Sequence, residues 1–206
     1  AAGITILEGY GMTENTSFTN VTTLDNLKFG TVGRPAPGVE QKINDDGEIV
    51  YRGRNVMKGY YKMPKETAAV LKKGWLYTGD LGMVDPEGNL IITGRKKEII
   101  ITSGGKNIAP APLESLITSS KYISQACVVG DRRKYLTALI TLDVDNIMEY
   151  ARANGIPVTG IHDLDGHPGI IKLMDAEMAR VNEQLASFES IKRYAIVPEF
   201  TIDGGT

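Results

Sequence analysis

The sequence predicts an α+β chain, in which a β-rich part comes first and a mixed part of strands and helices follows. Before Gly94, apolar runs at 39–43 and 48–52 flank an Asp-Gly pair, which is typical of a β-hairpin turn. After Gly94, strands and helices alternate, and a long helical pattern runs over 170–185. We therefore expect two domains, 1–94 and 95–206.

The other elements of the first part are short. The apolar run at 4–7, bounded by glycines, predicts a buried strand, and the Thr-, Asn-, Gly- and Pro-rich stretch 15–37 predicts irregular structure. A proline in the first turn favours a helix over 64–71. Strands at 76–84 and 90–93 complete a small β-rich subdomain.

The second part predicts its own core. Apolar residues recur at three- and four-residue steps along 170–185 and form one face of a helix: Ile170, Leu173, Met174, Met178, Val181 and Leu185. The remaining pattern predicts helices at 112–119 and 146–154 and strands at 98–102, 122–129, 136–142 and 191–197.

Composition excludes broad classes of partner. The 206 residues include 23 basic and 25 acidic side chains, a net charge of −2 that gives no general attraction to nucleic acid or to an anionic membrane. Cys127 is the single cysteine, so no internal disulfide forms, and its side chain is expected to pack in a core.

We expect a cytoplasmic protein, since the sequence has neither a signal peptide nor an apolar run of about 18 residues. The first residues lack a methionine and the last ones stop abruptly, which predicts a piece of a longer protein.

One acidic turn and one basic cluster are candidates for binding a sugar phosphate. Asp80 ends a Thr-Gly-Asp turn, where its carboxylate is able to accept hydrogen bonds from a pair of sugar hydroxyls. Arg95, Lys96 and Lys97 follow the next strand and carry the charge to hold phosphate. The alternatives are a turn carboxylate that bonds local backbone and a solvated basic face.

The glycine-rich loop at 8–14 adds two candidates. It lacks the third glycine of a dinucleotide-binding fingerprint, because Glu14 stands in that position. Its Thr13 and Glu14 suit either contacts to a ligand or a helix cap.

A second glycine-rich loop contains Gly104, Gly105 and Lys106. Asn107 stands where a Walker phosphate loop needs Ser or Thr, so the sequence does not predict that motif.

The segment 162–167 holds both histidines and two aspartates, a composition found in metal sites. A calcium loop needs glycine where Pro168 stands and glutamate where Met174 stands, so the sequence favours a solvated loop. Because both histidines lie here, no Ser-His-Asp set is predicted.

Four stretches, taken in order, resemble the adenylate-forming (acyl-activating) enzymes. They are Tyr-Gly-Met-Thr-Glu at 10–14, Gly-Glu-Ile-Val-Tyr-Arg-Gly at 47–53 with 59–64, Gly-Trp-Leu-Tyr-Thr-Gly-Asp at 74–80 and Gly-Arg-Lys-Lys-Glu at 94–98. The resemblance covers nearly the whole chain and is strongest to long-chain fatty acyl-CoA synthetases. Residues 74–97 look like their fatty-acid signature, and 181–193 look like their late helix.

The resemblance implies the end of a large adenylation domain, here a short β-rich subdomain, followed by a small mobile C-terminal domain of mixed α+β type. The implied reaction has two steps, in which ATP and a fatty acid form an acyl-adenylate and coenzyme A then displaces AMP to form a thioester. ATP, Mg²⁺ and coenzyme A are the implied cofactors. No nucleic acid is implied as a partner, and any peripheral membrane contact would run through residues outside this sequence.

The resemblance also assigns roles to residues of this sequence. In the nucleotide site, Tyr10 would pack on adenine beside Gly11, Thr13 would touch phosphate, Glu14 would hold Mg²⁺, Asp80 would bind both ribose hydroxyls and Arg95 would assist at the ribose. The loop with Gly104, Gly105 and Lys106 would help to form the channel for the pantetheine arm, and Gly94 would be the hinge between the domains.

The sequence also departs from the family pattern. It lacks the upstream Ser/Thr/Gly-rich phosphate loop and the lysine after the final strand, and Gly94, Lys73 and Val84 replace the usual Asp or Lys, Asp and Trp. We expect these 206 residues to be inactive alone and their parent to be a ligase. The alternatives are a fatty acyl-AMP ligase or a peptide-synthetase adenylation domain, and a noncatalytic interaction module built from 95–206.

Overall fold

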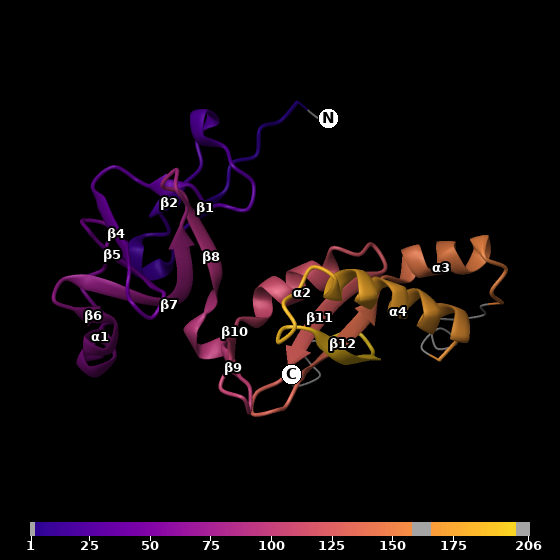
Figure 1. The fold of residues 1–206 in the computed structure, drawn as a ribbon. Coiled ribbons are helices and arrows are strands. Elements are labelled where there is room, and N and C mark those ends of the chain that lie inside the picture. The colour runs from indigo at the N-terminus through magenta and orange to yellow at the C-terminus, as the bar shows by residue number, and fades with distance from the viewer. Residues whose placement is uncertain (1–2, 158–165, 201–206) are drawn as a thin grey trace. The chain divides into compact units, whose positions relative to one another are not determined.

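The computed structural model describes residues 3–157 and 166–200 and folds into two compact units, Ala1–Lys97 and Glu98–Thr206 (Figure 1). The sequence places a domain boundary at Gly94–Arg95, whereas the structure divides after Lys97. The reason is that Arg95 still pairs with Asp80 in the last strand of the first unit.

The first unit is built on a five-stranded antiparallel sheet. Its strands run in the order β4-β5-β7-β6, and β8 also pairs with β7. Their bounds are β4 (Val39–Ile43), β5 (Glu48–Gly53), β6 (Leu71–Lys72), β7 (Trp75–Val84) and β8 (Leu90–Arg95), and helix α1 (Pro64–Val70) precedes β6. The predicted Asp-Gly hairpin, the strands predicted at 76–84 and 90–93 and the predicted short helix are therefore confirmed.

A smaller three-stranded sheet comes before it in the chain. It contains β1 (Gly9–Tyr10), β2 (Asn20–Val21) and β3 (Arg34–Pro35), with the short 3-10 helices η1 (Thr13–Asn15) and η2 (Leu24–Asn26) between them. Irregular structure was correctly predicted for most of 15–37.

The predicted buried strand at 4–7 is wrong. Ile4 and Ile6 are 77% and 78% exposed, and no strand forms there. An apolar run becomes a buried strand only where neighbouring backbone pairs with it, and no described residue of this chain does so.

Residues of β5 and β8 form the core of the first unit. Ile49, Tyr51 and Leu90 are fully buried, and Tyr10 packs against them from the smaller sheet. The Tyr51 hydroxyl donates a hydrogen bond to Asn20 Oδ1 within this core, which satisfies the buried phenol. The core thus connects the two sheets at the position of Tyr10.

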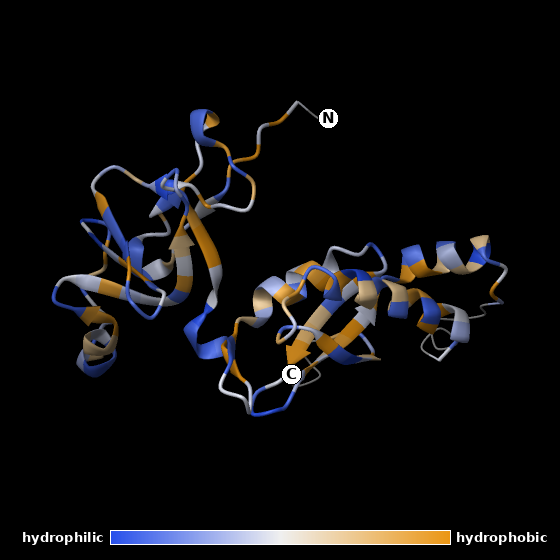
Figure 2. Cartoon of the chain, in the orientation of Figure 1, coloured by the Kyte–Doolittle hydropathy of each residue, from blue (hydrophilic) through white to orange (hydrophobic). Residues whose placement is uncertain are grey.

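The second unit packs helices on a three-stranded sheet. In this sheet β11 (Ile123–Val129) and β12 (Leu136–Leu142) are antiparallel, and β13 (Ile191–Ile196) runs parallel to β12. The helices are α2 (Pro110–Thr118), α3 (Val144–Ala153) and α4 (Pro168–Asn182). Figure 2 shows mostly hydrophobic residues along β11 and β12, which is the pattern of strands inside a core.

Helix α4 buries the apolar stripe that the sequence predicts. Ile170, Met174, Met178 and Val181 are at most 4% exposed, and each such side chain contributes about 1.5–3 kcal/mol by leaving water. Pro168 occupies the first turn, and His167 caps the helix because its Nδ1 accepts the Gly169 N–H at 3.1 Å.

The strand predicted over 98–102 is mostly wrong. Only β9 (Ile100–Ile101) forms there, and it pairs with β10 (Asn107–Ile108), because the 3-10 helix η3 (Lys96–Glu98) takes up the preceding residues. Cys127 lies half-buried in β11, where burial raises the pKa of its thiol. The proposed solvated loop at 162–167 falls largely outside the described residues.

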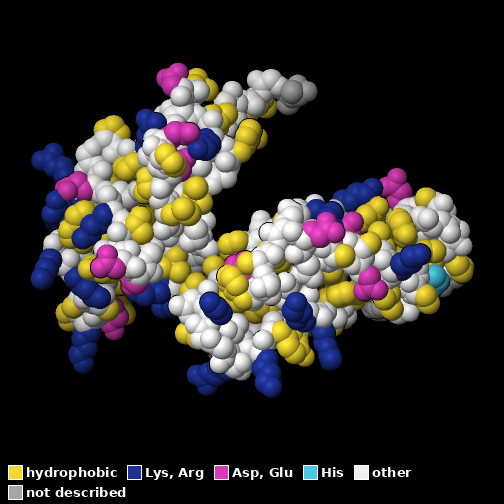
Figure 3. All heavy atoms as spheres, in the orientation of Figure 1, with side chains coloured by type: hydrophobic (Ala, Val, Ile, Leu, Met, Phe, Trp, Pro, Cys, Tyr) yellow, Lys and Arg dark blue, Asp and Glu magenta, His cyan; other side chains and the backbone are white. Residues whose placement is uncertain are grey.

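Charge is spread over both units. Figure 3 shows Lys and Arg side chains interspersed with Asp and Glu on the face that it presents. Within 3–157 and 166–200, no group of three or more His, Cys, Asp or Glu side chains is placed to hold a metal ion. In the same described ranges, no helix combines the length and hydropathy that a membrane crossing needs.

Candidate functional site

A bulge in β7 presents Asp80. In the β5–β7 ladder Glu48 pairs with Leu81 and Val50 with Tyr77, so 78–80 stand opposite Ile49 alone. Gly79 has a φ of 76°, a value that glycine adopts without strain. The Thr78 hydroxyl fixes the bulge, because it donates to Ile49 O at 2.7 Å and accepts from the Asp80 N–H at 3.0 Å.

Asp80 joins three separate elements. It is 7% exposed, and its Oδ2 accepts a hydrogen bond from the Tyr10 hydroxyl at the end of β1. Its Oδ1 accepts a hydrogen bond from Arg95 Nε on β8 at 3.1 Å, which also makes an ion pair. The structure therefore brings together Tyr10, Asp80 and Arg95, and the turn carboxylate bonds side chains of two other strands rather than local backbone.

Tyr10 is held as a hydrogen-bond donor. Burial, followed by the hydrogen bond and charge of Asp80, raises the pKa of Tyr10 far above its usual range. The ring centroid of Tyr10 lies 6.1 Å from that of Tyr51, whose own pKa is raised chiefly by burial. A neutral phenol therefore faces the Asp80 carboxylate at any physiological pH.

The loop that follows Tyr10 depends on close backbone packing. A Cβ on Gly11 would lie 2.2 Å from the carbonyl carbon of Ser17, so only glycine fits. Asn15 is fully buried, and its Oδ1 accepts the Met12 N–H at 2.8 Å. The capping role that the sequence allows for Thr13 or Glu14 is therefore filled by Asn15.

Glu14 is half-buried, and Thr13 is exposed beside it. Glu14 Oε1 accepts a hydrogen bond from the Tyr60 hydroxyl at 2.7 Å, and this bond is the main cause that raises the pKa of Tyr60. Mg²⁺ is commonly held by one or two carboxylates together with phosphate oxygens and water rather than by a cage of protein ligands. A single accessible carboxylate at Glu14 fits such a site.

The basic cluster at 95–97 is largely paired. Lys96 Nζ lies 2.6 Å from Asp46 Oδ2 and 2.9 Å from Glu48 Oε2, and hydrogen bonds to these carboxylates raise the pKa of Lys96. The alternative of a purely solvated basic face is therefore wrong for Lys96, which is paired with two carboxylates. Asp46, Glu48 and Tyr60 went unnoticed in the sequence because their partners lie far away in the chain.

The remaining candidates belong to the second unit. Gly104, Gly105 and Lys106 lie in the exposed loop between β9 and β10, where Gly105 has a φ of 73° and donates to Thr102 O at 2.9 Å. The Lys106 ammonium lies 5.4 Å from the ring centroid of Phe188. These residues are thus gathered in one loop of their own unit.

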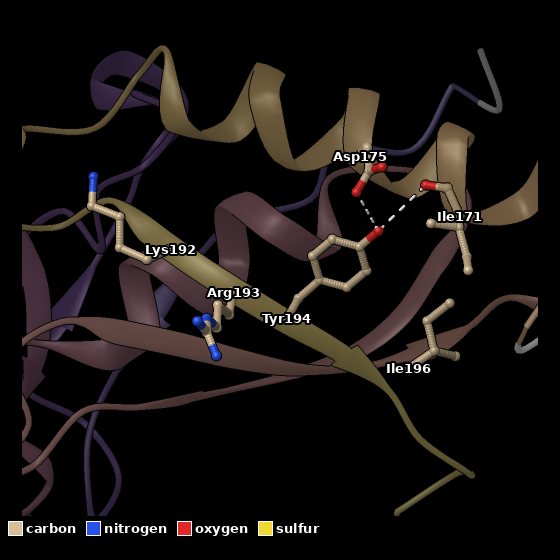
Figure 4. A pocket seen from close by; sticks show the side chains of 6 residues that line it. All are labelled: Ile171, Asp175, Lys192, Arg193, Tyr194 and Ile196. Atoms are coloured by element: carbon tan, nitrogen blue, oxygen red, sulfur yellow. Dashed lines mark hydrogen bonds between the residues drawn. The ribbon is translucent and has the colours of Figure 1, made fainter. Parts of the chain in front are cut away.

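A hollow of about 430 Å³ lies between α4 and β13 (Figure 4). The Tyr194 hydroxyl points toward α4 and donates to Asp175 Oδ1 at 2.7 Å and to Ile171 O at 3.3 Å. Burial and Asp175 raise the pKa of Tyr194. Because none of Tyr10, Asp80 and Arg95 lines this hollow, we assign it no part in the site.

The chain has a β-rich unit that carries the Tyr10–Asp80–Arg95 cluster, and a separate α+β unit follows it. Both units match models of one protein family. Residues 1–61 match the family described as AMP-binding enzyme, and residues 97–201 match AMP-binding enzyme C-terminal domain. The chain belongs to the AMP-binding enzyme family, which confirms the resemblance to adenylate-forming enzymes.

Curated relatives are named as fatty acid ligases. A long-chain-fatty-acid–CoA ligase of Mycobacterium tuberculosis is 43% identical over 99% of this chain, and the peroxisomal long chain acyl-CoA synthetase 7 of Arabidopsis thaliana is 36% identical over 98%. The chain spans 34% of the length of the first and 32% of the second.

Solved structures share the fold. The O-succinylbenzoate coenzyme A synthetase of Bacillus subtilis, in complex with ATP and magnesium ion, matches with a TM-score of 0.69 and 30% identity over 93% of this chain and 37% of its own. The same enzyme in complex with AMP gives a TM-score of 0.70 and 29% identity over 95% of this chain and 38% of its own. The predicted α+β class is thereby confirmed.

Proposed function

We propose that this chain is the C-terminal portion of an ATP-dependent long-chain fatty acid–CoA ligase of the cytoplasm. The observation that carries the proposal is the Tyr10–Asp80–Arg95 cluster, in a chain that belongs to the AMP-binding enzyme family. Because the chain spans about a third of its relatives, the activity is proposed for the full-length protein that contains it.

Asp80 is the proposed ribose acceptor. A carboxylate offers about four lone-pair sites, and Tyr10 and Arg95 occupy one each. The side chain keeps 10% of its surface exposed, so acceptor capacity remains for the two ribose hydroxyls. Arg95 holds the carboxylate in position while its exposed guanidinium stays near the sugar.

The loop after β1 is the proposed phosphate side of the site. Tyr10 packs on adenine, and the tight backbone at Gly11 lets the exposed Thr13 reach phosphate. Glu14 is the proposed Mg²⁺ ligand, with Tyr60 orienting its carboxylate. When bound, Mg²⁺ supplies positive charge that offsets the charge on the phosphate oxygens.

The second unit would serve the thioester step. Its exposed loop, with Gly104, Gly105 and Lys106, is the proposed lining of the path for the pantetheine arm of coenzyme A. The backbone of this loop is restrained, since Ser103 N–H donates to Arg133 O at 2.9 Å. Because Gly104 and Gly105 have no side chains, this loop leaves space for the pantetheine arm.

The test uses the full-length protein with palmitate, ATP and Mg²⁺, and follows pyrophosphate release and then palmitoyl-CoA formation after coenzyme A is added. Asp80→Asn should reduce kcat/KM for ATP by about 10- to 100-fold, the size of a lost charged hydrogen bond. Glu40→Gln, which removes an exposed carboxylate paired with Arg52 in the same unit, is the matched control.

Three outcomes decide the proposal. Palmitoyl-CoA formation that is weakened by Asp80→Asn and not by Glu40→Gln supports it. If the acyl group is transferred to a carrier protein and not to coenzyme A, the full-length protein is a fatty acyl-AMP ligase instead. No pyrophosphate release with any fatty acid would overturn the proposed activity.

A further inference from the structure

Glu48, the first residue of β5, connects the two sides of the Asp80 cluster. Its Oε1 accepts the Gly79 N–H at 2.9 Å, and its Oε2 accepts from Lys96 Nζ at 2.9 Å. Gly79 directly precedes Asp80, and Lys96 directly follows Arg95. One side chain therefore holds the neighbours of both charged members of the cluster.

Because Glu48 is buried, its carboxylate depends on the two partners that it has. The residue is 5% exposed, and a buried carboxylate is costly unless it is paired and hydrogen-bonded. Each of its two oxygens has one such partner, and both partners lie in the segments that carry Asp80 and Arg95.

An ion pair elsewhere in the same sheet differs from the Glu48 arrangement in burial and in partners. Glu40 on β4 pairs with Arg52 on β5, and the two side chains are 56% and 48% exposed. The side chain of Glu48 is only 7% exposed, and it reaches the backbone of the bulge as well as a lysine. Glu40 thus pairs only at the sheet surface, whereas Glu48 bonds the backbone of the bulge directly.

We propose that Glu48 is a positioning residue for the nucleotide site, which fixes the β7 bulge through Gly79 and the end of β8 through Lys96, and so sets the relative position of Asp80 and Arg95. This inference rests on the proposed role of Asp80 and Arg95 at the ribose. Glu48 itself touches neither of them and is not a catalytic residue.

The experiment measures AMP affinity by calorimetry, together with KM for ATP and kcat for pyrophosphate release, in the full-length protein. Glu48→Ala removes both hydrogen bonds, Glu48→Gln keeps an acceptor for Gly79 but loses the charge that pairs with Lys96, and Lys96→Met removes the lysine side alone. Glu40→Gln and Lys65→Met are matched controls, since they remove the same charges from exposed positions of the same unit. A thermal melt of each variant reports whether it has folded.

Glu48→Ala should weaken AMP binding by about tenfold and raise KM for ATP by a similar factor while kcat changes less than threefold. Glu48→Gln should recover part of this loss, and Lys96→Met should weaken AMP binding by about threefold. If Glu48→Ala proves unfolded, Glu48→Gln still decides, because it leaves no unpaired carboxylate in the core and Lys96 keeps Asp46 as a partner.

The proposal is overturned if Lys96→Met and Glu48→Gln bind AMP as the unaltered protein does while Asp80→Asn binds it weakly. It is also overturned if the loss in Glu48→Ala falls on kcat alone, or if the controls lose as much affinity. If Asp80→Asn itself leaves AMP binding unchanged, the proposed ribose role fails, and the inference about Glu48 fails with it.

Discussion

Asp80 and Arg95 face each other across β7 and β8, and Arg95 Nε donates to Asp80 Oδ1 at 3.1 Å. They are direct partners in the strand register, although a bulge interrupts the ladder at Leu81 and Gly82. The pair is asymmetric, because the Arg95 side chain is 66% exposed and that of Asp80 is 10% exposed. Arg95 thus covers a carboxylate that the bulge has turned inward.

Replacing the guanidinium should affect binding more than folding. Arg95→Lys should weaken AMP binding by about three- to tenfold, because an ammonium lacks the fixed planar donors of arginine. The melting temperature should change little, since lysine keeps the positive charge beside Asp80 and the Arg95 side chain is 66% exposed. Arg52→Lys is the control, and calorimetry that finds equal losses in both variants would exclude a special role for Arg95.

Removing the Tyr10 hydroxyl should destabilise the first unit. In Tyr10→Phe the buried Asp80 carboxylate loses a donor, which should lower the free energy of unfolding by about 1–3 kcal/mol. Tyr61→Phe provides the control, because Tyr61 is 85% exposed. Urea unfolding measures both variants, and identical midpoints would show that the hydrogen bond from Tyr10 contributes nothing.

The same phenol should make stability depend on alkaline pH. Burial and Asp80 raise the pKa of Tyr10 above its ordinary value of 10.0, so the folded state keeps a proton that the unfolded state releases. The stability that Tyr10 contributes is therefore fully present below about pH 10 and falls as the pH rises beyond it. Unfolding measured from pH 8 to 11 should show a shallower decline in Tyr10→Phe than in the unaltered protein, and parallel curves would refute this linkage.

The turn after Tyr10 should not tolerate a side chain. Gly11→Ala would place a Cβ 2.2 Å from the Ser17 carbonyl carbon, so the loop must shift and carry Glu14 with it. We expect a lower melting temperature and weaker AMP binding. Gly104→Ala meets nothing closer than 3.9 Å and should melt as the unaltered protein does. Equal melting temperatures for the two variants would show that the Gly11 loop adapts freely.

Local patterns predicted the elements that depend on neighbours in sequence. The Asp-Gly turn at Asp46 and Gly47 and the apolar stripe of α4 each express a short-range rule, and both form as predicted. The exposed run at 4–7 shows the limit of such rules, because burial depends on what packs against a segment. Nothing within the run itself carries that information.

The site is harder to predict because distant residues build it. Tyr10 and Asp80 are 70 positions apart, and Glu48 lies 48 positions from Lys96. Their meeting depends on strand register and on a bulge that no spacing in the sequence reveals. Asp80 and Arg95 became candidates through the pattern of an acidic turn and a basic cluster, and Tyr10 through the family resemblance, but neither predicts the supporting contact of Glu48.

A variant at the junction between the units should affect one of the two proposed half-reactions more than the other. The sequence places the hinge at Gly94, but this residue lies within β8, pairs with Leu81 and has a φ of 152°. Gly94→Pro would therefore disturb the strand that carries Arg95, and it should reduce adenylation and thioester formation alike. The hinge is better sought at Lys97, where the first unit ends.

Lys97→Pro restricts the backbone at the junction without interrupting β8. If the units must reorient between the half-reactions, this variant should slow palmitoyl-CoA formation by about tenfold or more while pyrophosphate release stays within about threefold of the unaltered protein. Lys97→Ala, which removes the same charge and leaves the backbone free, should preserve both rates. Equal losses of both half-reactions in Lys97→Pro would argue that the chain carries no hinge at this position.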